Sequence, residues 1–274
     1  KSVFQRLILD QGFYPDGIYT APNDEALKKD IELSYAMGFN GARLHEKIFE
    51  PRFLYWADKM GYLVWGEYPN WGLDHAHPNA LERVLPEWIE ALDRDFNHPS
   101  IIGWAPFNET SVRQNHELLR NAYRVTKAID PTRPVIDTSG YVHVESDIWD
   151  SHNYEQDPDK FAKIFDPFKT SEEIFENYEQ PGIYKGEPYF VSEYGGIWWN
   201  PGDEGGWGYG NRPKTEEEFL ARYKGLTEYL LSHPKMFGFC YTELYDVEQE
   251  VNGLYTYDRK PKFDPEIIRK INIQ

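Results

Sequence analysis

Residues 39–67, FNGARLHEKIFEPRFLYWADKMGYLVWGE, contain two short apolar runs separated by a longer amphipathic stretch. Phe39–Leu44 and Tyr62–Trp65 have the length and the apolar composition of buried strands. Between them, Phe53–Lys59 is predicted to be a helix, and Gly61 follows it as a helix stop. A strand, a helix and a second strand in this order are typical of a parallel α/β fold.

The same alternation continues on both sides of this stretch. It predicts six more strands, at Val3–Leu9, Ile101–Trp104, Pro134–Asp137, Ile148–His152, Pro188–Val191 and Phe237–Tyr241. It also predicts six more helices, at Asn23–Gly38, Pro86–Phe96, Leu118–Ile129, Phe161–Tyr178, Thr215–Leu231 and Pro265–Ile271. Eight strands that alternate with seven helices within 274 residues indicate a closed (β/α)8 barrel, a TIM barrel, that forms a single α/β domain over residues 1–274.

The composition argues against several classes of function. The net charge of -17 disfavours a nucleic-acid partner, because phosphate binding needs clustered Lys and Arg, and it also disfavours docking on an anionic membrane. No run approaches the roughly 20 apolar residues of a membrane helix. Cys240 is the lone cysteine, so an intramolecular disulfide is impossible and the compartment is left open. Aromatic residues make up 16% of the chain, which suits a carbohydrate site, although large rings also fill barrel cores.

Polar side chains follow most of the predicted strands, at the end where TIM barrels carry their active sites. They are Arg43, His45, Glu67, Asn108, Glu109, His152, Asn153, Tyr154, Glu193, Glu243 and Asp246. A single glutamate in such a place is usually a solvated loop residue. Glu109 and Glu193, however, follow the fourth and seventh predicted strands, which lie on opposite sides of a barrel mouth. We therefore expect these two side chains to face each other across a substrate.

Two facing carboxyl groups suit the hydrolysis of a glycosidic bond. One group must be protonated to give a proton to the leaving oxygen, and the other must be ionised to stabilise or attack the oxocarbenium-like centre. The two groups stand ~5–5.5 Å apart in retaining enzymes and ~6.5–9.5 Å apart in inverting enzymes. The spacing of the two carboxyl groups is therefore the property of this site that predicts the stereochemistry.

Four segments carry a family resemblance. Residues 94–104 (RDFNHPSIIGW), followed by Phe107-Asn108-Glu109, resemble the acid/base signature of glycoside hydrolase family 2, and residues 190–196 (FVSEYGG) resemble its nucleophile segment. Residues 40–45 (NGARLH) and 58–67 (DKMGYLVWGE) are similar to its second and third strands. The resemblance covers nearly the whole chain and implies a TIM-barrel hydrolase of β-linked glycosides, similar to a β-galactosidase.

The resemblance implies a role for each matching residue. Glu109 would be the general acid/base and Glu193 the nucleophile of a retaining glycosidase. Asn108 would hydrogen-bond the 2-hydroxyl group of the sugar, Arg43 would keep the nucleophile ionised, and Tyr154 would donate a hydrogen bond to it. The other expected substrate-binding residues are His45, Glu67, His152 and Trp198, with a structural ion pair as an equal alternative for Glu67.

Two features depart from the family pattern. Family members carry a tryptophan platform on strand eight where this chain has Tyr241, so Tyr241 is expected in the pocket floor. β-Sandwich domains normally precede the barrel, and we expect this chain to be a fragment of a longer protein whose missing domains help to complete the pocket. The chemistry requires no organic cofactor. A divalent cation is an option, but His75 and His77 lie in a Pro-rich loop without further ligands nearby in the sequence.

The glycone, the sugar on the reacting side of the bond, is expected to be neutral. β-Glucuronidases of this family share an Asn-x-Lys motif that grips the sugar carboxylate, and no Asn in this chain is followed two positions later by Lys. The net negative charge of the chain also provides no long-range electrostatic attraction for an anionic substrate. A terminal β-galactoside is the default substrate. A β-glucuronide, a β-mannoside and a non-catalytic carbohydrate-binding barrel are the alternatives.

Overall fold

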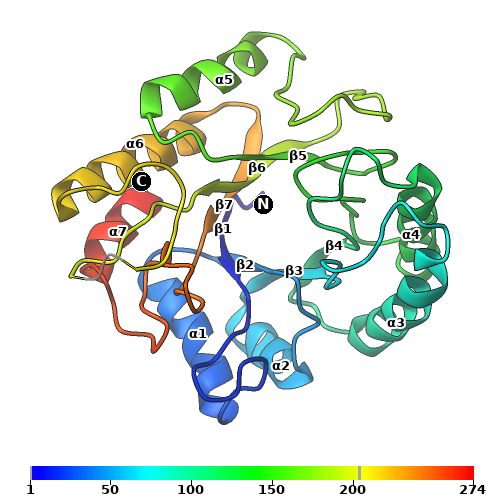
Figure 1. Ribbon diagram of the computed structural model, residues 1–274, viewed down its shortest axis with the longest axis horizontal. Helices are drawn as coiled ribbons and strands as arrows, with labels where there is room; N and C mark the ends of the chain where they lie inside the picture. The colour runs from blue at the N-terminus through cyan, green and yellow to red at the C-terminus, as the bar shows by residue number, and fades with distance from the viewer. Residues whose placement is uncertain (1, 203–204) are drawn as a thin grey trace.

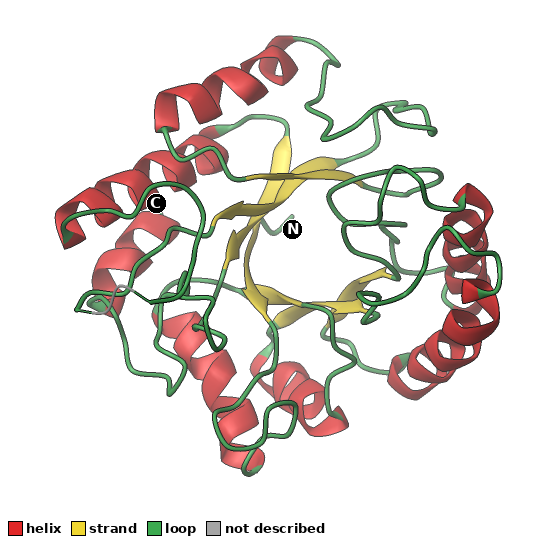
Figure 2. Cartoon of the chain, viewed as in Figure 1, coloured by secondary structure: helices red, strands yellow, loops and turns green. Residues whose placement is uncertain are grey.

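The computed structural model describes residues 2–202 and 205–274, and its centre is a single curled sheet of parallel strands. Over these residues the sheet has seven strands, in the order β4-β3-β2-β1-β7-β6-β5. The helices lie around the outside of the sheet (Figures 1 and 2). The strands are β1 (Gln5–Asp10), β2 (Gly41–Leu44), β3 (Leu63–Glu67), β4 (Ile101–Ala105), β5 (Trp149–Asn153), β6 (Tyr189–Gly195) and β7 (Met236–Thr242).

Each strand is followed along the chain by one helix. The helices are α1 (Asp24–Ala36), α2 (Pro51–Met60), α3 (Ala80–Asp95), α4 (His116–Ile129), α5 (Pro158–Thr170), α6 (Glu216–Ser232) and α7 (Pro265–Asn272). Asn23 caps α1, since its Oδ1 accepts from the amide of Ala26 at 2.9 Å. Gly61 ends α2 with a φ of 70°, a left-handed conformation that glycine adopts without strain. Among the described residues, no helix is both long enough and apolar enough to cross a membrane.

The strand predicted at Pro134–Asp137 is wrong, because this segment does not form a regular ladder. Val135 pairs with Trp104 of β4 only as an isolated parallel bridge. Pro134 has no amide hydrogen to donate, and the amide of Val135 donates to the side chain of Asp147 at 3.0 Å rather than to a neighbouring strand. The amide of Asp147, which precedes β5, donates back to the Val135 carbonyl at 2.9 Å. The segment therefore lies between β4 and β5 and completes the (β/α)8 barrel without being a strand.

The helix predicted at Phe161–Tyr178 is α5, and it ends well before Tyr178. Ser171 stops it, because its backbone is extended, with φ -133° and ψ -176°. The Ser171 amide and hydroxyl both donate to the Pro167 carbonyl, at 3.1 and 2.8 Å, and cap the last helical turn. The prediction was right about the start of this helix to within a few residues and too long at its end.

Two apolar cores lie on opposite faces of the sheet. The larger one lies between the strands and the helices, and the smaller one fills the barrel with Leu7, Leu9, Trp65, Ala105, Ile136, Ile148, Phe190 and Cys240. Inside the barrel, Trp65 of β3 stacks on Phe190 of β6, with ring centroids 6.3 Å apart. Gly103 of β4 makes room for the indole, because a Cβ there would lie 2.3 Å from the ring of Trp65. This packed interior supports the polar side chains at the carboxyl ends of the strands.

Candidate active site

Arg43 is the centre of a hydrogen-bond network at the carboxyl ends of the strands. It lies in β2 and is 1% exposed. Its Nε donates to Glu67 Oε1 at 2.7 Å, Nη1 donates to Glu193 Oε1 at 3.0 Å, and Nη2 donates to Asn108 Oδ1 at 3.0 Å. Burial lowers the pKa of Arg43, but the charges of Glu67 and Glu193 outweigh burial and raise that pKa above its usual value. One permanent, planar cation thus fixes three side chains from separate parts of the barrel.

Glu193 lies within β6 and is 4% exposed. Besides Arg43, the hydroxyl of Tyr154 donates to Glu193 Oε2, and His152 Nδ1 lies 3.3 Å from the same oxygen. Tyr154 is held in place by Tyr209, whose ring stacks on it at a centroid distance of 3.4 Å. Burial and the charge of Glu193 raise the pKa of Tyr154 well above its usual value, so its hydroxyl stays protonated and remains a donor. These donors fix the orientation of the carboxylate and stabilise its negative charge.

Glu109 lies in the loop after β4, and its side chain is 21% exposed. Its φ of 47° lies in the left-handed region, which residues other than glycine rarely adopt. The amide of Glu109 donates to the carbonyl of Ser139 at 3.0 Å, which ties this loop to the irregular segment beside β4. His152 Nδ1 lies 2.5 Å from Glu109 Oε1. Burial raises the pKa of Glu109, but the hydrogen bond and the charge of His152 outweigh burial and lower that pKa below its usual value.

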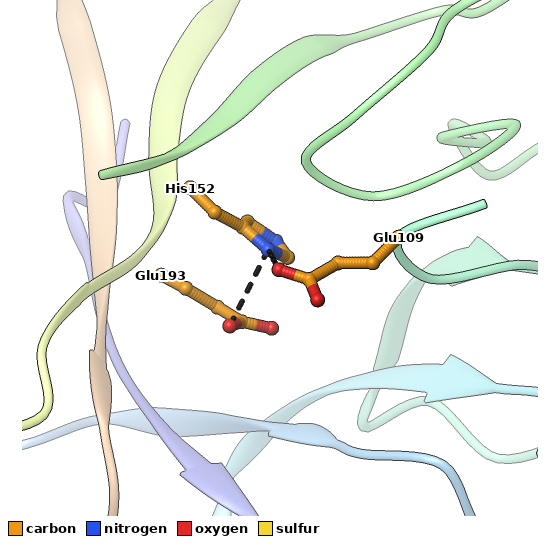
Figure 3. Close-up of side chains that lie close together, drawn as sticks. All are labelled: Glu109, His152 and Glu193. Atoms are coloured by element: carbon orange, nitrogen blue, oxygen red, sulfur yellow. Dashed lines mark hydrogen bonds and ion pairs between the residues drawn. The ribbon is translucent and has the colours of Figure 1, made fainter. Parts of the chain in front are cut away.

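The two carboxyl groups meet at one ring nitrogen of His152, Nδ1 (Figure 3). One oxygen of Glu109, Nδ1 of His152 and one oxygen of Glu193 all lie within 4.8 Å of one another. Figure 3 also shows that Glu109 reaches this point from the right and Glu193 from the left, below the imidazole ring, and that both carboxyl groups meet the same ring nitrogen. This approach is close to the ~5–5.5 Å typical of retaining glycosidases and shorter than the ~6.5–9.5 Å of inverting ones.

The same three side chains could in principle hold a metal ion. Each offers one ligand atom to the group. The ligand atoms already serve other bonds, however: His152 Nδ1 lies 2.5 Å from Glu109, and Glu193 binds both Arg43 and Tyr154. A cation would have to break the contact between His152 and Glu109 and would lie beside the Arg43 guanidinium. These surroundings fit a hydrogen-bonded pair better than a divalent cation, and an ion here stays a prediction.

Asn108 presents a free donor to the site. Its Oδ1 accepts from Arg43, while Asn70 holds its backbone: the Asn108 amide donates to Asn70 Oδ1 at 2.7 Å, and Asn70 Nδ2 donates to the Asn108 carbonyl at 3.0 Å. Asn108 Nδ2 is buried and has no hydrogen-bond partner in residues 2–202 and 205–274. A buried donor without a partner is costly, so this atom is suited to a ligand that brings an acceptor.

Glu67 takes part in a buried ion-pair chain. Besides the bond from Arg43, Glu67 Oε2 lies 3.1 Å from His45 Nδ1. Burial raises the pKa of Glu67, but the charge of Arg43 and the hydrogen bond of His45 outweigh burial and lower that pKa. The ring of His45 contacts Trp71 edge to face at 5.3 Å, and Trp71 is 58% exposed. Glu67 thus has the contacts of the structural ion pair, whereas His45 lies nearer the rim of the site.

Tyr241 does not lie in the pocket floor, which corrects the expectation from the sequence. Its ring is fully buried in the outer core, 5.5 Å from Tyr194 of β6 and 4.9 Å from Tyr223 of α6. Side chains alternate between the two faces of a strand. The next residue, Thr242, therefore faces the site, and its Oγ1 lies 3.2 Å from the Tyr154 hydroxyl.

Trp198 lies in the loop after β6, outside the network around Arg43. The guanidinium of Arg212 lies over its ring, 5.8 Å from the centroid. Stacking of Trp198 on a sugar therefore stays a prediction.

Three polar residues behind His152 are part of the site and were missed from the sequence. Ser139 Oγ donates to Asp150 Oδ2 at 2.7 Å and lies 3.2 Å from His152 Nε2. Asp150 also pairs with His143 Nε2 at 3.1 Å. Burial raises the pKa of Asp150, but the hydrogen bond and the charge of His143 outweigh burial and lower it to about 2. The sequence did contain a signal for Asp150. It lies two residues before His152 in the same strand, so the two side chains are expected on the same face.

Comparison with known proteins identifies the family. A family model described as glycosyl hydrolases family 2, TIM barrel domain, matches residues 21–273. A β-galactosidase of Vibrio cholerae serotype O1 is 33% identical over 121 residues, which are 41% of this chain and 11% of that protein. A β-glucuronidase of Rattus norvegicus is 32% identical over 116 residues, which are 40% of this chain and 18% of that protein.

The fold also matches solved structures. A β-galacturonidase from Eisenbergiella tayi, in a crystal structure with bound galacturonate, superposes with a TM-score of 0.77 at 18% identity, over 98% of this chain and 51% of that one. This likeness bears on the fold alone. The chain spans about half of that structure and a much smaller share of the two relatives above. The family match over residues 21–273 shows that this chain belongs to glycosyl hydrolases family 2 and forms its TIM barrel domain.

Proposed function

We propose that this domain hydrolyses a terminal β-linked glycoside with retention of configuration, with Glu193 as the nucleophile and Glu109 as the general acid/base. The observation that carries the proposal is the geometry of the two carboxyl groups. They approach within 4.8 Å. They also differ in their surroundings, because Glu193 is fixed by Arg43 and Tyr154, whereas Glu109 has His152 Nδ1 2.5 Å from one oxygen and is partly exposed.

The reaction proceeds in two steps that balance. In the first, a Glu193 oxygen forms a bond to the anomeric carbon while the bond to the leaving oxygen breaks, and Glu109 gives its proton to that oxygen. In the second, Glu109 takes a proton from a water molecule as the water oxygen attacks the anomeric carbon, and Glu193 leaves as a carboxylate. The sugar is released with its original β configuration, and both glutamates return to their starting states.

The neighbouring side chains support these steps. Arg43 and Tyr154 bind the two Glu193 oxygens, so they position the nucleophile and stabilise the carboxylate that departs in the second step. Asn108 Nδ2 is available to a sugar hydroxyl, and we assign it to the 2-hydroxyl group, where a hydrogen bond that strengthens in the transition state accelerates the reaction.

The proposed substrate is a neutral glycoside, with a β-galactoside as the default. Two observations support a neutral glycone: the chain lacks an Asn-x-Lys sequence, and its net charge is -17. A relative named β-galactosidase is 33% identical, but a relative named β-glucuronidase is 32% identical over a similar length, so the identities do not choose between them. A carbohydrate-binding barrel without activity is the other alternative, and the presence of both glutamates argues against it.

A trapping experiment on the full-length protein tests the chemistry. An activated 2-deoxy-2-fluoro β-galactoside should react with the protein once, and peptide mass mapping should locate the sugar on Glu193. Nuclear magnetic resonance of an ordinary β-nitrophenyl galactoside reaction should show the β anomer as the first product. A label on Glu67 or Glu243, or a first product with the α configuration, would reject the proposed roles.

A further inference from the structure

A second group of carboxyl side chains lies beside the catalytic pair, where β7 meets β1. Glu243 follows β7 directly, Gln11 follows β1 directly, and Glu250 lies in the loop after β7. Gln11 Nε2 donates to Glu243 Oε2 at 2.7 Å and to Glu250 Oε2 at 3.4 Å, so one amide group bridges the two carboxyl groups. Asn252 Nδ2 donates to the other oxygen of Glu250 at 3.1 Å.

This group faces the catalytic side chains. Thr242, the residue before Glu243, contacts the hydroxyl of Tyr154, and that hydroxyl binds Glu193. Burial raises the pKa of Glu250, and the hydrogen bonds from Asn252 and Gln11 offset part of this rise. The charge of His45 also lowers this pKa and the charge of Glu193 raises it, so Glu250 lies within electrostatic range of both. The group therefore forms the β7–β1 side of the same bowl in which Glu109 and Glu193 meet.

Two buried acceptors in this group have no partner. Glu243 is 1% exposed, and its Oε1 makes no hydrogen bond within the described part of the chain. Asn252 Oδ1 is likewise buried and unpaired over the residues described. Burial and the charge of Glu250 raise the pKa of Glu243 well above its usual value, which favours the neutral, protonated form of this carboxyl group. A neutral carboxyl group both donates to and accepts from a hydroxyl group, and sugar hydroxyls would satisfy these atoms.

Two lysines on this side of the barrel already bind other partners. Lys262 Nζ donates to Asp246 Oδ1 at 2.5 Å, to the Trp199 carbonyl at 2.7 Å and to the Val251 carbonyl at 3.3 Å, which uses its three hydrogens. Lys47, which contacts the backbone just after Gln11, donates to the carbonyls of Gly12 and Tyr19 and to Glu50. The carboxylate of a uronic acid would therefore enter beside Glu243 and Glu250 as a third acidic group without a free cation from either lysine.

We propose that Glu243, Gln11 and Glu250 form the glycone-binding wall of the site, which binds the hydroxyl groups of a neutral sugar and rejects a uronic acid. The inference rests on the proposed glycosidase function and identifies the side chains that select its substrate class. Glu250 acts mainly by repelling a carboxylate, and Glu243 acts mainly by hydrogen bonding to hydroxyls. The discrimination between the two sugar classes is therefore a property of this wall.

The test compares sugars that differ only at carbon 6. The ratio of kcat/KM for nitrophenyl β-galactoside to that for nitrophenyl β-galacturonide is measured on the full-length protein, with the gluco pair alongside. The wild type should favour the neutral member of each pair. Glu250→Gln keeps the size of the side chain and one of its two acceptor oxygens but removes its charge. The ratio should therefore fall by about tenfold or more, as expected for a unit charge within a few ångströms of the sugar carboxylate.

Glu248→Gln is the matched control, because Glu248 lies in the same loop, is exposed, and loses the same charge on substitution. Its ratio should stay at the wild-type value. An equal fall in Glu248→Gln and Glu250→Gln would indicate a long-range field effect and overturn the proposal. An unchanged ratio in Glu250→Gln, or a wild type that prefers the uronides, would overturn it as well.

Calorimetric binding of free galactose and galacturonate separates this inference from the proposed function. If the protein hydrolyses none of the substrates, the proposed function fails, yet the wall is still tested by whether galactose binds more tightly than galacturonate. Loss of that preference in Glu250→Gln, with retention in Glu248→Gln, supports the wall even in an inactive protein. Equal binding of the two sugars by the wild type contradicts it.

Discussion

Glu193 and Glu109 carry the same functional group in contrasting surroundings. Glu193 lies in a regular strand, is 4% exposed, and receives bonds from Arg43 and Tyr154 on its two oxygens. Glu109 lies in a loop with a left-handed backbone, and its side chain is 21% exposed. Its close partner is His152, a side chain that can itself gain or lose a proton.

The difference matches what the two steps of the reaction demand. A nucleophile has to present one oxygen as an anion in a constant place, and a strand with fixed donors on both oxygens provides this. An acid/base has to lose a proton and regain it in each cycle, which needs a path to a second proton carrier or to water. Glu109 has a strained, left-handed φ, and its carboxyl group contacts His152. Strained backbone of this kind is commonly found at functional sites.

Substitution of Glu193 should have the largest effect. Glu193→Ala removes the atom that forms the covalent intermediate, so kcat should fall on the order of 10⁶-fold, as on removal of the nucleophile in other enzymes that form covalent intermediates. Azide added to this variant should restore partial turnover and yield an α-glycosyl azide, because the anion enters from the side that Glu193 occupied. Product stereochemistry is read by nuclear magnetic resonance. Formation of the β-glycosyl azide instead would mean that the two roles are reversed.

Substitution of Glu109 should have a large effect that depends on the substrate. Glu109→Ala should slow glycosides with poor leaving groups by about 10²–10⁴-fold, the usual contribution of general acid catalysis, and slow activated aryl glycosides far less in their first step. Azide should here yield the β-glycosyl azide, since it replaces water on the side of Glu109. Rates measured across a series of aryl leaving groups check this. A uniform loss over the whole series, without azide products, would contradict the assignment.

The parts of the site that lie on regular strands could be predicted from the sequence. Arg43, Glu67 and Glu193 follow from one rule, that polar residues at the carboxyl ends of parallel strands meet in one bowl. Tyr241 shows the limit of that rule. Its place on the strand was predicted correctly, but the face was wrong, because a shift of one residue turns a side chain from the mouth into the outer core.

The parts that lie on irregular backbone could not be predicted in the same way. The segment at Pro134–Asp137 has the apolar run of a strand, yet the side chains of Asp147 and Ser146 accept from its backbone amides. The spacing of apolar residues in the sequence does not reveal such bonds. Glu250 reaches the bowl from a loop whose course depends on contacts such as the Gly253 amide donating to Asp246 at 2.9 Å. Loops lack the regular side-chain periodicity of helices and strands, so the direction of a loop side chain cannot be predicted from its position in the sequence.

Arg43 offers a test of how far positioning alone sets the rate. Arg43→Lys keeps the positive charge, but a single ammonium cannot replace the separate bonds to Glu67, Glu193 and Asn108. We expect kcat/KM to fall about 10²-fold, the effect of a misplaced catalytic group, together with a lower midpoint of thermal unfolding. Arg52→Lys is the control, because Arg52 forms an exposed pair with Asp24. A similar loss of activity in both variants would show that the effect is general destabilisation.

The contrast between the two glutamates depends on His152, and removal of this ring should have the smallest and most specific effect. His152→Phe keeps the ring volume but removes the nitrogen 2.5 Å from Glu109 Oε1. Burial alone raises the pKa of Glu109, and the hydrogen bond and charge of His152 now lower it, so removing His152 should raise that pKa. The reaction needs Glu109 protonated in its first step, and a group with a higher pKa keeps its proton to a higher pH. The alkaline limb of the kcat/KM profile should therefore move to higher pH, measured with a substrate whose leaving group needs the proton.

His98→Phe is the matched control, since it breaks a similar contact, 2.6 Å to Asp58, at the amino end of β4. A limb that stays in place, or moves to lower pH, would mean that His152 does not lower the pKa of Glu109. The contrast between the two glutamates would then depend on the Arg43 and Tyr154 bonds to Glu193, on exposure and on the backbone.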